Sequence, residues 1–243
     1  MHLIKKISCS LTTIRDEPNL KSNKISEALF GEDFKIVKHI GPWCYGKLVK
    51  DGYEGWLNNS SLCEHVNCTH KVCVPCSVLK EQPNIKSLDV EYIFLGSELN
   101  VLSLDSDWAK VLLPSSFKDK YSYLPTKHIQ KMSTNKNNWI DLSEQFVGTP
   151  YVWGGRSYSG VDCSGLVQIC LQSSGIFCPR DSNLQFRYFK EESLNLNELK
   201  RGMLIFWEGH VGIVISKTSI LHSNAFHMST TIENLKDLIN RME

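Results

Sequence analysis

Short apolar stretches separated by turn residues fill the first half of the chain, and the pattern occurs twice. Residues 36–40, 45–49 and 55–57 are strand-like, with turn residues between them. The run 107–113 is similar to the run 42–49, since each places a tryptophan ahead of a strand. Strands of this length and spacing predict two small β-barrels of about 60 residues each. We assign residues 1–66 to the first barrel and residues 67–132 to the second.

The pattern changes after a polar segment, residues 133–138, which we interpret as a linker. The remaining residues, 139–243, contain apolar residues at helical spacing in some segments and strand-like runs in others. Helices are predicted at 139–147, 164–173 and 235–242, and strands at 203–215 and 220–226. The chain is therefore expected to place an α+β domain after the two barrels.

Charge and hydropathy argue against several classes of partner. The formal net charge is +1 and there is no basic block, so nothing favours binding to nucleic acid or to an anionic membrane. No run reaches the roughly 18 apolar residues of a membrane span. Near the N-terminus, Lys5 and Lys6 interrupt the apolar stretch of roughly 7–15 residues that a secretory signal needs. We therefore expect a cytoplasmic protein. A monomer is expected as well, without a sequence feature that indicates it.

The nine cysteines are expected to be mostly reduced thiols, because their number is odd and no export signal is present. One group resembles a zinc cluster at first sight, but only its Cys73 and Cys76 have ligand spacing. The alternative is an ordinary strand start at the junction of the two barrels, and we expect no metal and no cofactor. The residues of this group are Cys63, His65, Cys68, His70, Cys73 and Cys76.

One cysteine lies where a loop enters a predicted helix. Asp162 is a favoured N-cap residue, which leaves Cys163 in the first helical turn. Free backbone N–H groups and the positive helix end favour a thiolate there, so we expect a lowered pKa for Cys163. A cysteine in this position is otherwise a small buried apolar residue, and we expect Cys170 and Cys178 to be of that kind.

Two histidines occur in the strand-like region that follows. His210 begins an apolar strand, and His222 lies at an even offset in the next one. A hairpin closed near Lys217 can place both imidazoles on one face of the sheet, whereas a bulge would alter the register. A cysteine, a histidine base and a polar group that orients the base form a catalytic triad of the papain-like kind. These residues predict nucleophilic catalysis by Cys163.

Five motifs follow one another along the last part of the chain: Pro-Tyr-Val-Trp-Gly-Gly, Asp-Cys-Ser-Gly, Arg-Asp-Ser-Asn-Leu-Gln, Gly-His-Val-Gly-Ile and Leu-His-Ser-Asn-Ala-Phe-His-Met. In order and spacing, these motifs resemble the NlpC/P60 family of cysteine peptidases. The match extends from about Asn138 to the C-terminus, and the β modules resemble bacterial SH3 domains, notably in residues 51–57. The predicted fold class is multi-domain: two small SH3-like β-barrels followed by an α+β papain-like (NlpC/P60) catalytic domain, residues 139–243.

The resemblance implies a role for each matching residue. Cys163 would be the nucleophile, His210 the base and His222 the residue that orients it, and Tyr151 would stabilise the oxyanion. Ser223 departs from the alanine that usually follows the histidine in the family, which is a small change. Five further residues would line the substrate pocket: Trp153, Asp162, Ser164, Asp181 and Ser182.

The layout is similar to that of the murein-recycling members of the family, the γ-D-glutamyl-L-diamino acid endopeptidases of the dipeptidyl-peptidase VI type. These cleave after γ-D-glutamate and before the diamino acid, in short wall peptides with a free N-terminal L-Ala. The resemblance implies that Tyr53 and an acid, for which we name Glu17, recognise that amine. Glu17 is most simply a turn residue. We weigh two alternatives, an exported hydrolase of intact peptidoglycan and a non-catalytic wall-binding protein.

Overall fold

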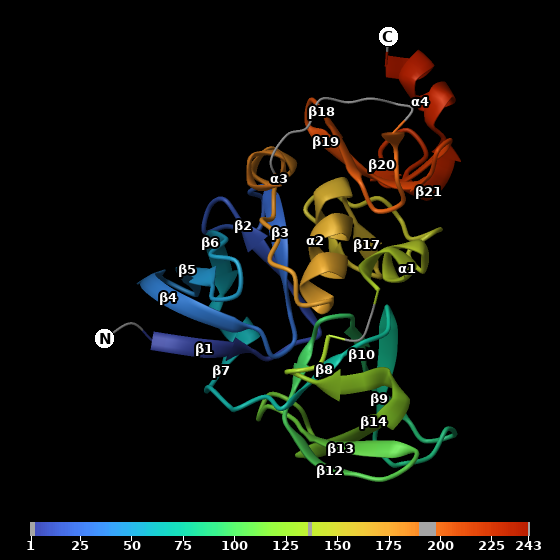
Figure 1. Ribbon diagram of the computed structural model, residues 1–243. Coiled ribbons are helices and arrows are strands. Elements are labelled where there is room, and N and C mark those ends of the chain that lie inside the picture. Colours follow the sequence, from blue (N-terminus) through green and yellow to red (C-terminus); the bar gives the residue numbers. More distant parts are fainter. Residues whose placement is uncertain (1–2, 136–137, 190–197, 243) are drawn as a thin grey trace. The chain divides into compact units, whose positions relative to one another are not determined.

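The computed structural model describes residues 3–135, 138–189 and 198–242 (Figure 1). The chain divides into two compact units, Met1–Thr134 and Asn135–Glu243. The predicted linker, residues 133–138, spans this division, and its residues 136–137 lie outside the described residues.

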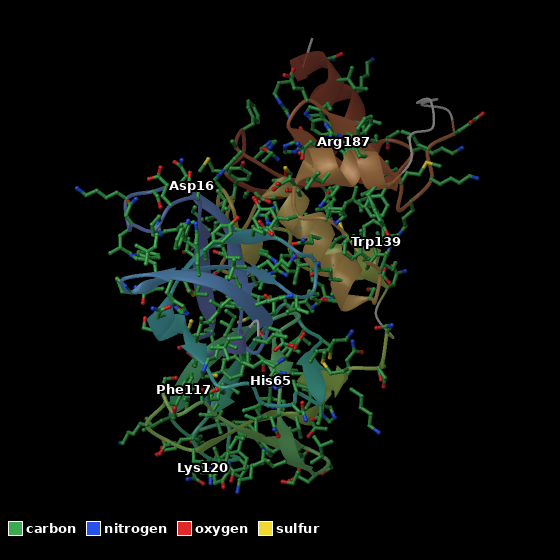
Figure 2. The ribbon with its side chains drawn as sticks, turned by 90° about the vertical axis from the view of Figure 1, so that its left-hand side faces the viewer. Asp16, His65, Phe117, Lys120, Trp139 and Arg187 are labelled. Carbon is green, nitrogen blue, oxygen red and sulfur yellow. The ribbon has the colours of Figure 1, made fainter. Side chains whose placement is uncertain are left out.

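The first β module of the N-terminal unit is one antiparallel sheet with the strand order β3-β2-β6-β5-β4-β1-β7. Its core contains Ile14, Phe34, Leu48 and Leu57, which alternate with more exposed residues as strands with one buried face require. Asp16 follows β2 and begins the β2–β3 loop (Figure 2). The strands are β1 (Leu3–Ile7), β2 (Leu11–Arg15), β3 (Lys24–Leu29), β4 (Asp33–Ile40), β5 (Trp43–Leu48), β6 (Glu54–Asn58) and β7 (Leu62–Cys63), with a 3-10 turn, η1 (Asn59–Ser61), before β7.

The second β module repeats this order and most of the pairing. Strands β9, β10, β13 and β14 pair as β2, β3, β5 and β6 do, and a 3-10 turn again precedes the last strand. Trp108 begins β13 as Trp43 begins β5, as the sequence predicts. The elements are β8 (His70–Val72), β9 (Cys76–Lys80), β10 (Asp89–Phe94), β11 (Glu98–Leu99), β12 (Val101–Leu104), β13 (Trp108–Leu112), β14 (Tyr121–Pro125), η2 (Thr126–His128) and β15 (Ile129–Lys131).

The two β modules share buried contacts. Phe30 of the first module packs into the core of the second, and its carbonyl accepts a 2.8 Å hydrogen bond from the Glu98 amide. The buried Lys6 ammonium lies 3.1 Å from the carboxylates of both Asp33 and Glu98. A buried charge needs such partners, so these contacts tie the modules into the single unit Met1–Thr134.

The C-terminal unit is an α+β domain built on the antiparallel sheet β18-β19-β20-β21. The predicted strand at 203–215 is two strands, because Gly209 adopts a φ of 71° and closes a turn between them. The elements are α1 (Trp139–Glu144), β16 (Arg156–Ser157), β17 (Gly160–Val161), α2 (Cys163–Ser173), α3 (Ser182–Tyr188), β18 (Leu204–Trp207), β19 (His210–Ser216), β20 (Ser219–Asn224), β21 (Ser229–Asn234) and α4 (Leu235–Met242). Trp139, the first residue of α1, is labelled in Figure 2.

Helix α2 is the centre of this domain. Every residue from Cys163 to Ser173 is buried, and the helix packs against α1 and against strands β19 and β20 (Figure 1). A helix that is apolar on most sides is expected in such a position. Within residues 3–135, 138–189 and 198–242, no helix is both long and apolar enough to cross a bilayer.

Candidate active site

The N-terminus of α2 is defined by Asp162 and a close approach of two backbones. The Asp162 carboxylate accepts hydrogen bonds from the amides of Gly165 at 2.7 Å and Gly154 at 2.8 Å, so it caps α2 and fixes the preceding loop. A Cβ on Gly165 would lie 2.1 Å from the Gly155 carbonyl oxygen, which only glycine avoids. These contacts hold Cys163 as the first residue of the helix.

Arg180 is a buried partner of Asp162 that we did not identify from the sequence. Its guanidinium donates to both carboxylate oxygens, at 3.0 and 2.7 Å, and to the Ser164 hydroxyl at 2.9 Å. The Gln185 amide donates to the Ser164 carbonyl at 2.9 Å and so ties α3 to the start of α2. Arg180 and Gln185 both belong to the motif at 180–185. The arginine in this motif was the sequence signal that could have predicted a partner for Asp162.

His210 and His222 lie together on one face of the β19–β20 hairpin. The turn falls at residues 217–218, and His210 Nε2 lies 2.9 Å from His222 Nδ1. The Trp207 ring stacks on His210 with centroids 4.6 Å apart and an interplanar angle of 33°, which limits rotation of the imidazole. The β19–β20 pairing shifts by one residue between Val214 and Ser216, and beyond this bulge Ile213 lies opposite Leu221. This shifted register puts the two histidines on one face, because the two-residue turn alone would place residues at an even offset on opposite faces.

The Cys163 thiol lies against the strand that carries His210. The backbone amides of Val211 and Ser164 both stabilise its thiolate form. Because Val211 directly follows His210, the sulfur lies next to the first residue of β19. His210 Nδ1 has no hydrogen-bond partner among the described residues, so it is the nitrogen available to a proton from the thiol.

Tyr151 completes the group around the sulfur. Burial, followed by the negative charges of Cys163 and Asp162, raises the pKa of Tyr151 to about 12. The phenol therefore stays protonated over the whole range in which an enzyme works. A protonated hydroxyl beside the Cys163 thiol can donate to an oxyanion.

The protonation state of the thiol differs from the sequence-based expectation. Burial, and then the Asp162 carboxylate, raises the pKa of Cys163 to about 11, and the two backbone amides do not offset this. Burial, and then the nearby His222, lowers the pKa of His210 to about 4. The expectation of a lowered thiol pKa was wrong in the free site, because it considered the helix end without the tertiary packing around it. The resting pair is a neutral thiol and a neutral imidazole.

This neutral pair predicts how alkylation of Cys163 depends on pH. Iodoacetamide reacts with thiolates, so its rate with Cys163 should rise roughly tenfold per unit from about pH 7 to about pH 10. The alkylation rate of an ordinary thiol would stop rising at about pH 9. The rate is measured by mass spectrometry of the peptide that contains Cys163. Cys170 and Cys178, which are 0% exposed against 7% for Cys163, serve as internal controls and should react more slowly. A rate that is flat between about pH 6 and pH 9 would instead indicate a preformed thiolate–imidazolium pair.

The other predicted pocket residues are distributed around this centre and beyond it. Asp181 is the N-cap residue of α3 and Ser182 is its first residue, next to Arg180. Trp153 is 69% exposed in the loop between Tyr151 and the close backbone approach at Gly155. Tyr53 and Glu17 belong to the N-terminal unit: the Tyr53 hydroxyl donates to the Ile25 carbonyl at 3.4 Å, and Glu17 lies in the β2–β3 loop. Their participation in the site stays a prediction.

The cysteine and histidine group at residues 63–76 does not converge. The Cys73 thiol donates to the Lys127 carbonyl at 3.8 Å and the Cys76 thiol to the Ser77 carbonyl at 3.7 Å. His65, labelled in Figure 2, lies in the segment between β7 and β8. In the part of the chain that the structure describes, no three His, Cys, Asp or Glu side chains are placed to hold a metal ion. The absence of a metal stays a prediction.

Comparison with known protein families matches both halves of the chain. Residues 148–239 match the NlpC/P60 family, and residues 14–62 match the bacterial dipeptidyl-peptidase Sh3 domain. The first match contains Cys163, His210 and His222, and the second contains Tyr53 and Glu17.

Individual relatives extend over nearly the whole chain. A protein named gamma-D-glutamyl-L-lysine dipeptidyl-peptidase from Bacillus cereus is 29% identical over 242 residues, covering 87% of this chain and 71% of the relative. Dipeptidyl-peptidase 6 of Lysinibacillus sphaericus is 23% identical and covers 91% of this chain and 88% of its own. The crystal structure of an NlpC/P60 family protein from Bacillus cereus superposes with a TM-score of 0.81 at 22% identity, covering 96% of this chain and 94% of the other, which shows the same fold.

The chain thus carries a bacterial SH3 domain and an NlpC/P60 domain, and it is a cysteine peptidase.

Proposed function

We propose that this peptidase hydrolyses the γ-D-glutamyl-L-diamino acid bond of free murein peptides, L-Ala-γ-D-Glu joined to diaminopimelate or Lys. The observation that carries the proposal is the position of Cys163 at the start of α2, beside the Val211 amide and the His210–His222 pair. The dipeptidyl-peptidase names of three relatives support the substrate.

The chemistry is acyl transfer to the cysteine sulfur. Cys163 Sγ attacks the γ-carbonyl carbon of D-Glu while His210 Nδ1 takes the thiol proton, because the resting thiol is protonated. The Tyr151 hydroxyl donates to the oxyanion. Collapse of the intermediate breaks the C–N bond, and His210 returns the proton to the leaving amine. Water then attacks the thioester, with His210 again as the base, and releases the dipeptide.

The N-terminal unit supplies substrate selection in this proposal. The first module matches a bacterial SH3 domain, and we propose that the second is SH3-like too, because it repeats the strand order and pairing of the first. Tyr53 and Glu17 recognise the free L-Ala amine and exclude peptides that are still joined to a sugar. The protein then acts as a monomer on free peptides in the cytoplasm, in cell-wall recycling.

Cleavage of short peptides tests this proposal. The chain should convert L-Ala-γ-D-Glu-L-Lys or its diaminopimelate counterpart into L-Ala-γ-D-Glu and the free diamino acid, as followed by mass spectrometry. N-Acetylation removes the ammonium that Tyr53 and Glu17 are proposed to recognise, which should slow cleavage about tenfold to a hundredfold. Tyr53→Ala should reduce the difference in cleavage rate between the free and the acetylated peptide. Tyr45→Ala, a matched change in β5 of the same module, should leave it unchanged.

The alternatives give different results in the same experiment. Equal rates on free and acetylated peptides, together with digestion of intact peptidoglycan, would favour the exported hydrolase. Binding to peptidoglycan without cleavage of any peptide would favour the wall-binding protein. Fractionation of the host adds an independent test, since recovery outside the cytoplasm would contradict the recycling role.

A further inference from the structure

The imidazole pair of the active site continues into a carboxylate that no motif pointed to. His222 Nε2 lies 2.5 Å from Glu233 Oε1, and Glu233 accepts two hydrogen bonds from Arg241, at 2.8 and 2.7 Å. The His222 side chain is 1% exposed and that of Glu233 is 11% exposed. The chain of contacts thus runs from His210 through His222 and Glu233 to Arg241 in helix α4.

Strand register brings Glu233 to His222. In the β20–β21 pair, His222 lies opposite Thr231, and Glu233 lies two residues further along β21 on the same face. Side chains at such diagonal positions are within reach of each other when they are long. Arg241 follows within α4, which begins at Leu235, so β21 and α4 together aim the carboxylate at the imidazole.

The hydrogen-bond chain determines which nitrogens carry protons. An ionised carboxylate only accepts hydrogen bonds, so His222 Nε2 must carry a proton to pair with Glu233. Burial lowers the pKa of His222, although Glu233 opposes this, so the ring is neutral near pH 7 and its Nδ1 is an acceptor. His210 Nε2 then donates to His222 Nδ1, and His210 Nδ1 keeps the lone pair that receives the thiol proton.

Asn224 competes with Glu233 for His222 Nε2, so the Glu233 carboxylate decides whether that nitrogen carries a proton. The Asn224 side-chain amide nitrogen lies 3.1 Å from the same His222 Nε2. Its oxygen is held by the His227 amide at 2.8 Å, so the NH2 group faces the imidazole. A donor there favours an unprotonated Nε2 and hence the opposite tautomer. Only the charged acceptor on Glu233 outweighs this, since charge-assisted hydrogen bonds are roughly twice as strong as neutral ones.

From this geometry we infer that Glu233, held by Arg241, is a positioning residue that keeps His222 in its Nε2–H tautomer and thereby leaves Nδ1 of His210 free to act as the base. The inference rests on the proposed roles of Cys163, His210 and His222. Without Glu233, Asn224 would donate to Nε2, His222 would be protonated at Nδ1, and it would donate to His210 Nε2. The His210 proton would then lie on Nδ1, the nitrogen that the mechanism needs unprotonated.

The test substitutes Glu233 by Met, which keeps the volume and removes the acceptor. In protein labelled with 15N-histidine, the ring-nitrogen NMR signals should show His222 protonated at Nε2 in the unaltered protein and at Nδ1 in Glu233→Met. Turnover of the tripeptide should show kcat reduced on the order of a hundredfold, with KM unchanged. Glu233→Asp keeps a carboxylate and should recover part of kcat together with the original tautomer.

The matched control is Glu144→Met. Glu144 also accepts two hydrogen bonds from an arginine, Arg201, at 2.7 and 3.0 Å, and it is bonded to neither histidine. This variant should keep both the tautomer and kcat. An unchanged His222 tautomer in Glu233→Met would overturn the inference, whatever happens to kcat, and so would a changed tautomer with kcat within a few-fold of the unaltered protein. The tautomer is measured without substrate, so failure of the proposed substrate would not be mistaken for failure of this inference.

Discussion

Replacing Cys163 by alanine should reduce turnover of the tripeptide by roughly 10⁴- to 10⁶-fold while leaving the fold intact. The sulfur is the only atom proposed to bond to the substrate, and loss of a nucleophile in a catalytic triad costs a factor of this size. The rate is measured by mass spectrometry over long incubations, and folding by circular dichroism and thermal unfolding. Helix α2 should persist, because Asp162 and Arg180, rather than the thiol, hold its first turn.

Cys170→Ala is the matched control for this experiment. Cys170 lies two turns further along the same helix and is completely buried. The Cys170→Ala variant should lose on the order of 1 kcal/mol of unfolding free energy through the cavity that the substitution leaves. Its turnover should stay within a few-fold of that of the unaltered protein. If Cys163→Ala cleaved the peptide as fast as the unaltered protein, the nucleophile would have to be another residue.

The secondary structure was largely predictable because its signals are local. Trp43 and Trp108 mark the starts of two strands, and the apolar spacing at 164–173 and 235–242 marks two helices within a residue of their observed bounds. Helical and strand periods can be read from a short window of sequence. The turn at Gly209 was missed although Glu208, Gly209 and His210 separate two apolar runs, because both runs were read as parts of one strand.

The partners of the site residues were harder to predict because they depend on register and packing. Glu233 meets His222 only once strands β20 and β21 are paired, and the loop between them sets that register. Arg180 lies 18 positions from Asp162 and pairs with it because α3 returns to the start of α2. The thiol pKa was misjudged for the same reason, since the helix end is visible in the sequence and the burial of Cys163 is not.

The second large effect is expected at Arg180, and it concerns stability. Arg180→Met leaves the Asp162 carboxylate buried without its counter-charge, and breaking a buried ion pair from one side typically costs about 3–5 kcal/mol. The free energy of unfolding of a folded domain is only about 5–15 kcal/mol, so the C-terminal unit should unfold at a much lower urea concentration. Arg180→Lys keeps the charge but cannot bind both carboxylate oxygens. Its urea midpoint should therefore lie between those of the unaltered protein and Arg180→Met.

A double-mutant cycle separates the ion pair from simple loss of packing at Arg180. Asp162→Asn removes the charge and keeps a side-chain oxygen that can cap α2, as asparagine often does. If the cost of Arg180→Met comes from the unpaired carboxylate, Asp162→Asn/Arg180→Met should be more stable than Arg180→Met alone, because removing both partners leaves no buried charge. Urea unfolding of the four proteins measures the coupling free energy. Additive losses would mean that Arg180 stabilises the site through its packed side chain, and the Asp162–Arg180 pair would then serve to orient Cys163 and Ser164 rather than to hold the domain together.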